Sequence, residues 1–205
     1  MQQPLLTRFL QSLGSDNAAV SDRQSNLFGR ALADYRQAAV LLAVVWHHHE
    51  WQLLLTRRAD TLRHHTGQIA LAGGRRDPHD SSFTATALRE AYEEIGTPPE
   101  IWQTFGEMPP RYTPSGYAVH AVPALAESLP ALSINPQEVA EVFYVPLTVA
   151  LNPKNYQTRT TLFQNQPRHT PVLPYGTYDI WGLTGLILFS AAERYQFFIK
   201  EHHII

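Results

Sequence analysis

The segment that most constrains the fold runs from a glycine pair to a capped helix and spans residues 73–96. A short strand over 67–74 is expected to end at the glycine pair, because glycine lets the backbone bend sharply and approach a ligand closely. The polar loop 75–82 follows. A helix is then predicted over 82–95, because Gly96 is a favoured C-terminal cap and two prolines after it prevent continuation. Three loop residues qualify as the N-terminal cap, namely Asp80, Ser81 and Ser82.

The same helix gathers three glutamates within five residues, Glu90, Glu93 and Glu94. Residues three or four apart are neighbours on a helix, so Glu90 lies beside the other two, and each like-charge pair costs roughly 0.2–0.5 kcal/mol. Either Arg89 and solvent spread this charge, or a cation binds. Carboxylate oxygens in this number suit Mg²⁺ or Mn²⁺, and a metal beside a phosphate polarises it and helps to ionise a water. The residues alone therefore point to metal-assisted hydrolysis of a phosphate compound, against the plainer interpretation of a solvated acidic face.

Length and composition indicate one fairly large domain with short appendages. The chain has 205 residues, of which 44% are hydrophobic, and a net charge of −2, so no general nucleic-acid surface is indicated. It has no cysteine, which excludes disulfides and a cysteine nucleophile. The first residues lack the pattern of a signal peptide, and the most apolar stretch, 180–192, is too short to span a bilayer. We therefore expect a cytoplasmic protein without nucleic-acid or membrane partners.

The remaining elements predict a mixed sheet with helices packed on it, an α/β (α+β) class. Strands are expected at 36–46 and 51–58 as a hairpin whose turn holds the histidine run, and at 101–108 and 116–125. Helices are expected at 5–13 and 179–199. The segment 135–151 is expected to hold a short helix, a strand and another helix, and 152–178 a hairpin or long loop. We divide the chain into an N-terminal helical extension, 1–35, and a domain over 36–205.

The segment 74–96 resembles the Nudix box. That box has a glycine, five residues, a glutamate, seven residues and then Arg-Glu-apolar-x-Glu-Glu-x-Gly-apolar. The matching residues are Gly74, Arg89, Glu90, Glu93, Glu94 and Gly96. Ala91 is smaller than usual, and Thr97 replaces an apolar residue. Asp80 stands in place of the loop glutamate, with eight residues before Arg89 instead of seven, which leaves a role for Asp80 open.

The preceding residues are similar to the signature of coenzyme A diphosphatases within the Nudix superfamily. That signature reads Leu-Leu-Thr-x-Arg-Ser, a later arginine, three residues, a glycine, three residues and Phe-Pro-Gly-Gly. Here Thr56 and Arg58 match, and Arg63 lies four residues before Gly67. Two positions depart from the signature: Ala59 replaces serine, and Leu71-Ala72 replaces Phe-Pro. The general resemblance extends over about 36–195, and its specific motifs over 53–96.

The resemblance implies a Nudix fold, which is an α/β/α sandwich with a mixed sheet, and hydrolysis of the diphosphate of coenzyme A. The products would be 4′-phosphopantetheine and adenosine 3′,5′-bisphosphate. It implies that Glu90 and Glu94 bind Mg²⁺ or Mn²⁺, with Glu93 as a further ligand or a shared neighbour, and that Arg89 holds these glutamates by ion pairing. The carboxylate base is left open between Glu90 and two glutamates of the acidic segment 137–143, Glu138 and Glu141. Substrate contacts are expected from four residues: Arg58, Arg63, Gly73 and Gly74.

Two alternatives stay open. One is a diphosphatase for ADP-ribose or a nucleotide sugar, which the Leu71-Ala72 replacement keeps in consideration. The other is a degenerate Nudix domain that senses a nucleotide without cleaving it. Such a domain is expected to lose the glutamates of the helix, which this chain retains. A homodimer is also left open.

Overall fold

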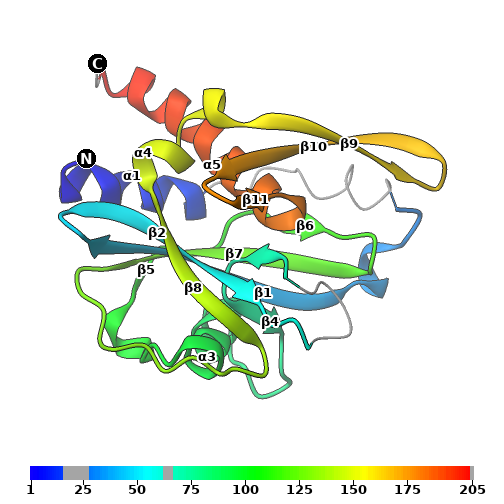
Figure 1. The fold of residues 1–205 in the computed structure, drawn as a ribbon, viewed down its shortest axis with the longest axis horizontal. Coiled ribbons are helices and arrows are strands. Elements are labelled where there is room, and N and C mark those ends of the chain that lie inside the picture. The colour runs from blue at the N-terminus through cyan, green and yellow to red at the C-terminus, as the bar shows by residue number, and fades with distance from the viewer. Residues whose placement is uncertain (16–27, 62–66, 204–205) are drawn as a thin grey trace.

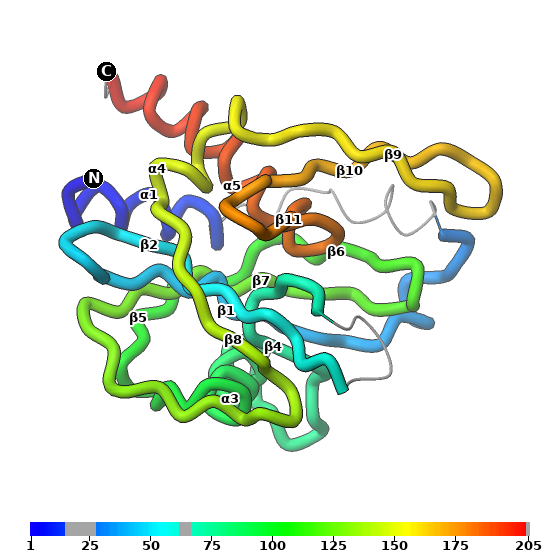
Figure 2. The backbone as a smooth tube through the Cα atoms, viewed as in Figure 1, coloured from blue at the N-terminus to red at the C-terminus, as the bar shows by residue number. Residues whose placement is uncertain are grey.

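A mixed sheet of eight strands forms the centre of the computed structural model, which describes residues 1–15, 28–61 and 67–203 (Figure 1, Figure 2). The central strand β1, Arg36–His47, is antiparallel to β2, Glu50–Arg58, and β4, Gly73–Arg75, and parallel to β7, Tyr117–Ala126. The other strands extend the sheet: β3 (Ile69–Ala70) and β8 (Val139–Pro146) pair with β2, and β5 (Gln103–Thr104) and β6 (Arg111–Tyr112) pair with β7. The pairing of β4 places the glycine pair directly beside the central strand.

The predicted hairpin of β1 and β2 is confirmed, and the histidine run forms its turn. His47 lies opposite Glu50, so two residues form the loop. His48 and His49 have φ angles of 48° and 65°, the left-handed conformation that two-residue hairpin loops require. His48 and His49 therefore form the hairpin turn. Among the described residues, no cluster of metal-binding side chains is found there.

Helices cover both faces of the sheet, as the sandwich prediction requires. Successive residues of a strand point to opposite faces. Leu41 of β1 packs in the core beneath α3, Phe83–Ile95, whereas Leu42 packs in the core shared with α1, Gln3–Ser15, and α5, Gly182–Glu201. Figure 1 shows α3 on one side of the sheet and α1 and α5 on the other. No helix in the described ranges has both the length and the apolar character that a bilayer crossing requires.

Helix α1 belongs to the main core. Its apolar stripe of four side chains with at most 1% exposure consists of Leu6, Phe9, Leu10 and Leu13. The ring of Phe9 meets the ring of Tyr195 on α5 edge to face, with centroids 4.9 Å apart. The boundary after residue 35 stays a prediction, but the helix of the proposed extension is packed into the same structure as the sheet.

The C-terminal part forms a second, three-stranded sheet, which confirms the hairpin alternative for 152–178. Its antiparallel strands are β9 (Gln157–Phe163), β10 (Gln166–Tyr175) and β11 (Tyr178–Ile180). Four short helical elements complete the described chain: η1 (Leu32–Asp34), η2 (Pro99–Ile101), α4 (Leu147–Ala150) and η3 (Pro153–Asn155).

Three local predictions are wrong in part. The strand expected over 101–108 is confined to β5, and the strand over 67–74 is split into β3 and β4 by the buried pair Leu71 and Ala72. The short helix expected after residue 134 is a turn instead. Its cause is Asn135, whose side-chain Oδ1 accepts a hydrogen bond from the backbone N–H of Gln137 and so competes with helical pairing.

Candidate active site

Helix α3 begins and ends where its own residues provide caps. Among the three candidate N-terminal caps, Ser82 has the extended conformation, and its Oγ accepts a hydrogen bond of 3.0 Å from the N–H of Ala85. At the other end Gly96 has a φ of 72°, and its N–H donates to the carbonyl of Tyr92. These caps set the register of the helix, and with it the direction of each glutamate.

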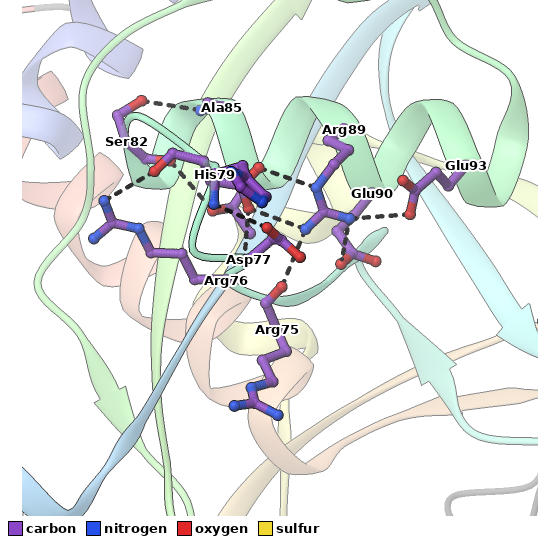
Figure 3. A network of polar contacts seen from close by, with 11 residues as sticks. Arg75, Arg76, Asp77, His79, Ser82, Ala85, Arg89, Glu90 and Glu93 are labelled. Atoms are coloured by element: carbon purple, nitrogen blue, oxygen red, sulfur yellow. Dashed lines mark hydrogen bonds and ion pairs between the residues drawn. The ribbon is translucent and has the colours of Figure 1, made fainter.

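Asp80 anchors the loop before the helix to Arg89. The Nε and Nη2 atoms of Arg89 donate to the two carboxylate oxygens of Asp80, each at 3.0 Å. Nη2 also donates to the carbonyl of Arg75, as Figure 3 shows. These hydrogen bonds lower the pKa of Asp80 to about 2. The sequence left the role of Asp80 open. In the structure, Asp80 makes a bidentate contact with Arg89. The aspartate is shorter than the glutamate of the Nudix pattern, and the segment between it and Arg89 is one residue longer.

We expect Asp80→Asn to lower the free energy of unfolding at pH 7 by roughly 1–2 kcal/mol, because it removes a charge-assisted bidentate pair. The pKa of Asp80 is lowered in the folded state, so its stabilisation is present above about pH 4 and is lost as the pH falls toward 2. Urea unfolding at pH 7 and at pH 2.5 measures this difference, which should shrink at the lower pH. Ser81→Ala, a change at an exposed neighbour, is the control. Equal stability of Asp80→Asn and wild type at pH 7 would contradict the anchor.

The three helical glutamates lie in different environments. Glu93 is the outermost, with a side chain 51% exposed, and it accepts a hydrogen bond of 3.0 Å from Arg89 (Figure 3). Glu90 is 15% exposed and also contacts Arg89 at 3.0 Å. Glu94 is only 3% exposed and accepts a hydrogen bond of 3.3 Å from the N–H of Gly73. Arg89 therefore pairs with Glu90 and Glu93, while Glu94 accepts from the glycine pair instead.

Burial makes Glu94 an unusual carboxylate. Desolvation raises the pKa of Glu94 to about 8, although the Gly73 N–H and the positive charge of Arg58 oppose the shift. Desolvation likewise raises the pKa of Glu90, against the opposing effect of Arg89. Among the described residues, the hydrogen bond to the carboxylate of Glu94 comes from a backbone amide and not from a cationic side chain. A carboxylate in this position is suited to binding a cation.

Glu138 is connected to the end of α3 through Asn135, whereas Glu141 contacts other elements. The N–H of Asn135 donates to the carbonyl of Glu94 at 2.9 Å, and its Nδ2 donates to Oε1 of Glu138 at 3.3 Å. The negative charge of Glu138 adds only a minor part to the raised pKa of Glu90 and of Glu94. Glu141 instead accepts a hydrogen bond of 2.6 Å from the hydroxyl of Tyr178 and lies 3.5 Å from Nε of Arg57. Neither glutamate lies on a helix: Glu138 ends the turn before β8, and Glu141 is within the strand.

The glycine pair is required by close packing. A Cβ atom on Gly73 would lie 2.3 Å from the carbonyl oxygen of Ala39, and one on Gly74 would lie 2.5 Å from Oε2 of Glu90. Gly73 also has a φ of 153°, which other residues rarely adopt. The backbone of β4 thus lies directly against the carboxylates of α3. Of the other predicted substrate contacts, Arg58 lies near Glu94, whereas Arg63 lies outside the described residues.

The carboxylates of α3 suit a hard divalent cation, although the described residues hold no preassembled group of three metal ligands. Glu90 and Glu94 are carboxylates with little exposure to solvent, and oxygen ligands of this kind suit Mg²⁺ or Mn²⁺. Cation binding would relieve the repulsion between these carboxylates.

Comparison with known proteins matches residues 35–166 to the NUDIX domain family. A protein from Photorhabdus laumondii, described as an uncharacterized Nudix hydrolase NudL, is 40% identical over 161 residues, which cover 78% of this chain and 86% of that protein. A protein of the same description from Pectobacterium atrosepticum is 40% identical over 80% of this chain and 84% of its own length. In structure, a MutT/nudix family protein from Enterococcus faecalis covers 90% of this chain and 72% of its own, with a TM-score of 0.50 and 17% identity, which is a likeness of fold.

Proposed function

This chain belongs to the Nudix family and is a hydrolase of pyrophosphate bonds, and we propose that its substrate is coenzyme A or a derivative of it. The observation that carries the proposed chemistry is the buried carboxylate of Glu94 at the glycine pair, with the carboxylate of Glu90 packed against the same pair. Nudix enzymes generally use divalent ions such as Mg²⁺ or Mn²⁺. Glu90 and Glu94 would hold the ion here, with Glu93 as a further ligand at the solvent edge.

Different residues of the chain would have different roles in the hydrolysis. A bound Mg²⁺ or Mn²⁺ supplies polarisation of the diphosphate oxygens and a lower pKa for a nearby water. Glu138 accepts the proton of the water that attacks phosphorus, because its carboxylate is held by the neutral amide of Asn135 beside the end of α3. The bridging P–O bond then breaks, and Arg58 stabilises the charge of the phosphate groups. Arg89 keeps Glu90 and Glu93 in place through its ion pairs.

The choice of coenzyme A rests on residues 53–74, and their departures from the signature do not weigh against it. Leu71 and Ala72, which replace Phe-Pro, are 3% and 1% exposed and belong to the two cores on either side of the sheet. Their replacement is therefore a change of core packing rather than of a surface that a substrate reaches. Arg58, and Arg63 as the second contact expected from the sequence, would supply positive charge for a substrate that carries several phosphate groups.

Product analysis with Mg²⁺ or Mn²⁺ tests this proposal. Coenzyme A, ADP-ribose, NADH and a diadenosine polyphosphate are offered in parallel to the purified protein. Release of adenosine 3′,5′-bisphosphate and 4′-phosphopantetheine from coenzyme A, with slower turnover of the others, is the expected result. Preference for ADP-ribose would move the substrate to a nucleotide sugar while keeping the mechanism. Tight binding without turnover of any compound would overturn the enzymatic proposal in favour of a sensor.

A further inference from the structure

We propose that Asn135 is a positioning residue that holds the carboxylate of Glu138 in place beside the end of α3. This inference rests on the function proposed above, in which Glu138 is the base. It concerns a residue outside the Nudix box, in the turn that precedes β8.

Every polar group of Asn135 is engaged. Its N–H donates to the carbonyl of Glu94 at 2.9 Å, and its own carbonyl accepts from the N–H groups of Glu138 and Val139 at 3.1 and 2.9 Å. Its side-chain Oδ1 accepts from the N–H of Gln137 at 3.1 Å, and its Nδ2 donates to Oε1 of Glu138 at 3.3 Å. One residue thereby joins the end of α3, which carries Glu94, to the carboxylate of Glu138.

The orientation of this amide follows from its partners. A backbone N–H only donates, so the Asn135 atom that meets Gln137 must be the oxygen, and the NH₂ group must face Glu138. An NH₂ group is a neutral donor. It orients the Glu138 carboxylate without the opposite charge that would make it a poorer proton acceptor.

The segment that carries Asn135 is locked to the helix. The N–H of Ser133 donates to the carbonyl of Ile95 at 3.1 Å, so this segment satisfies carbonyls that the end of a helix leaves without partners. A Cβ atom on Gly96 would lie 2.7 Å from Cβ of Ser133. The backbone of this segment is thus fixed against the end of α3. The remaining freedom of the Glu138 carboxylate lies in its own side chain, which the amide of Asn135 orients.

A fixed orientation matters because a general base acts only when its oxygen is within hydrogen-bond reach of the proton that it removes. Glu138 is only partly buried, so its side chain could turn toward solvent without a partner. The contact from Asn135 engages Oε1 of Glu138. In this proposal the other carboxylate oxygen accepts the proton of the water.

Asn135→Asp separates this role from a structural one. The new carboxylate still accepts from the N–H of Gln137, so the turn is kept, but it presents a negative oxygen where Glu138 needs a donor. We expect kcat to fall by about tenfold or more, a usual effect of losing a partner that orients an active-site group, with KM within twofold and an unchanged Tm. Asn152→Asp is the matched control, because Oδ1 of Asn152 accepts from the N–H of Lys154 in a similar turn at η3, which packs against α4 and α5. It should leave kcat unchanged.

A double-mutant cycle with Glu138→Gln completes the test, run on the diphosphate that the wild type cleaves best. If Asn135 acts through Glu138, Asn135→Asp reduces kcat little further once Glu138 is replaced. If Asn135→Asp keeps the wild-type kcat while Glu138→Gln loses most of it, this inference alone is overturned. The same holds if the double variant loses kcat by the product of the two single losses, because the two residues would then act independently. Full activity of Glu138→Gln would overturn the base assignment and this inference with it. A wild type that cleaves no diphosphate would overturn the proposed function itself.

Discussion

Glu94→Gln is expected to stabilise the metal-free protein while abolishing its turnover. Desolvation raises the pKa of Glu94 from its ordinary value of 4.5 to about 8. Between these values the folded state keeps a proton that the unfolded state has released, so the free energy of unfolding falls as the pH rises from about 4.5 to 8. Glutamine has no such proton. At pH 8, without divalent ions, we expect the variant to exceed wild type by on the order of 1–3 kcal/mol, since each pKa unit corresponds to about 1.4 kcal/mol.

Urea unfolding with EDTA at pH 5 and pH 8 checks this expectation, because the gain should appear at pH 8 and shrink at pH 5. Addition of Mn²⁺ or Mg²⁺ should then raise the Tm of wild type and leave the Glu94→Gln variant nearly unchanged, since binding to the folded state adds stability only where the ligands are present. Turnover in saturating metal should fall to background in the variant. Glu93→Gln, at the exposed and arginine-paired position, is the comparison and should change the unfolding free energy little at either pH. A less stable Glu94→Gln protein at pH 8 would refute the cation-site interpretation.

Glu138→Gln is expected to reduce kcat by about 10²–10⁴, the usual contribution of a positioned general base. KM for the diphosphate should change little, because the amide keeps the size of the side chain and its acceptor oxygen for Asn135. The measurement is steady-state kinetics at saturating Mg²⁺ over pH 6–9, together with Tm to show that the variant is folded.

Glu141→Gln is the matched control for this experiment. It lies three residues away in the same chain segment, but its carboxylate is bound by the Tyr178 hydroxyl and lies near Arg57. We expect its kcat to stay within twofold of wild type, with at most a modest loss of stability. If Glu141→Gln loses activity and Glu138→Gln retains it, the assignment of the base is reversed.

Local patterns in the sequence were sufficient for much of the fold. The hairpin of β1 and β2, the helix ended by Gly96 and the acidic turn on that helix each depend on residues close together in the chain. The alternation of apolar and polar residues in a strand, a helix cap and the spacing of side chains on a helix each involve only a few consecutive residues. They can therefore be recognised in the sequence without the tertiary structure. The chain also determined by itself that Glu90, Glu93 and Glu94 share one helix.

Only the tertiary structure decided which acid does what. Asp80 pairs with Arg89 because the loop folds back on the helix, and Glu94 is buried because β4 lies against α3 beside the central strand. Glu138 and Glu141 are the same residue type three positions apart, yet Glu138 is held by Asn135 beside the end of α3 and Glu141 contacts β11 through Tyr178. Burial and proximity between distant segments control the pKa of a carboxylate and its partners, and these are properties of the assembled fold rather than of any short stretch of the chain.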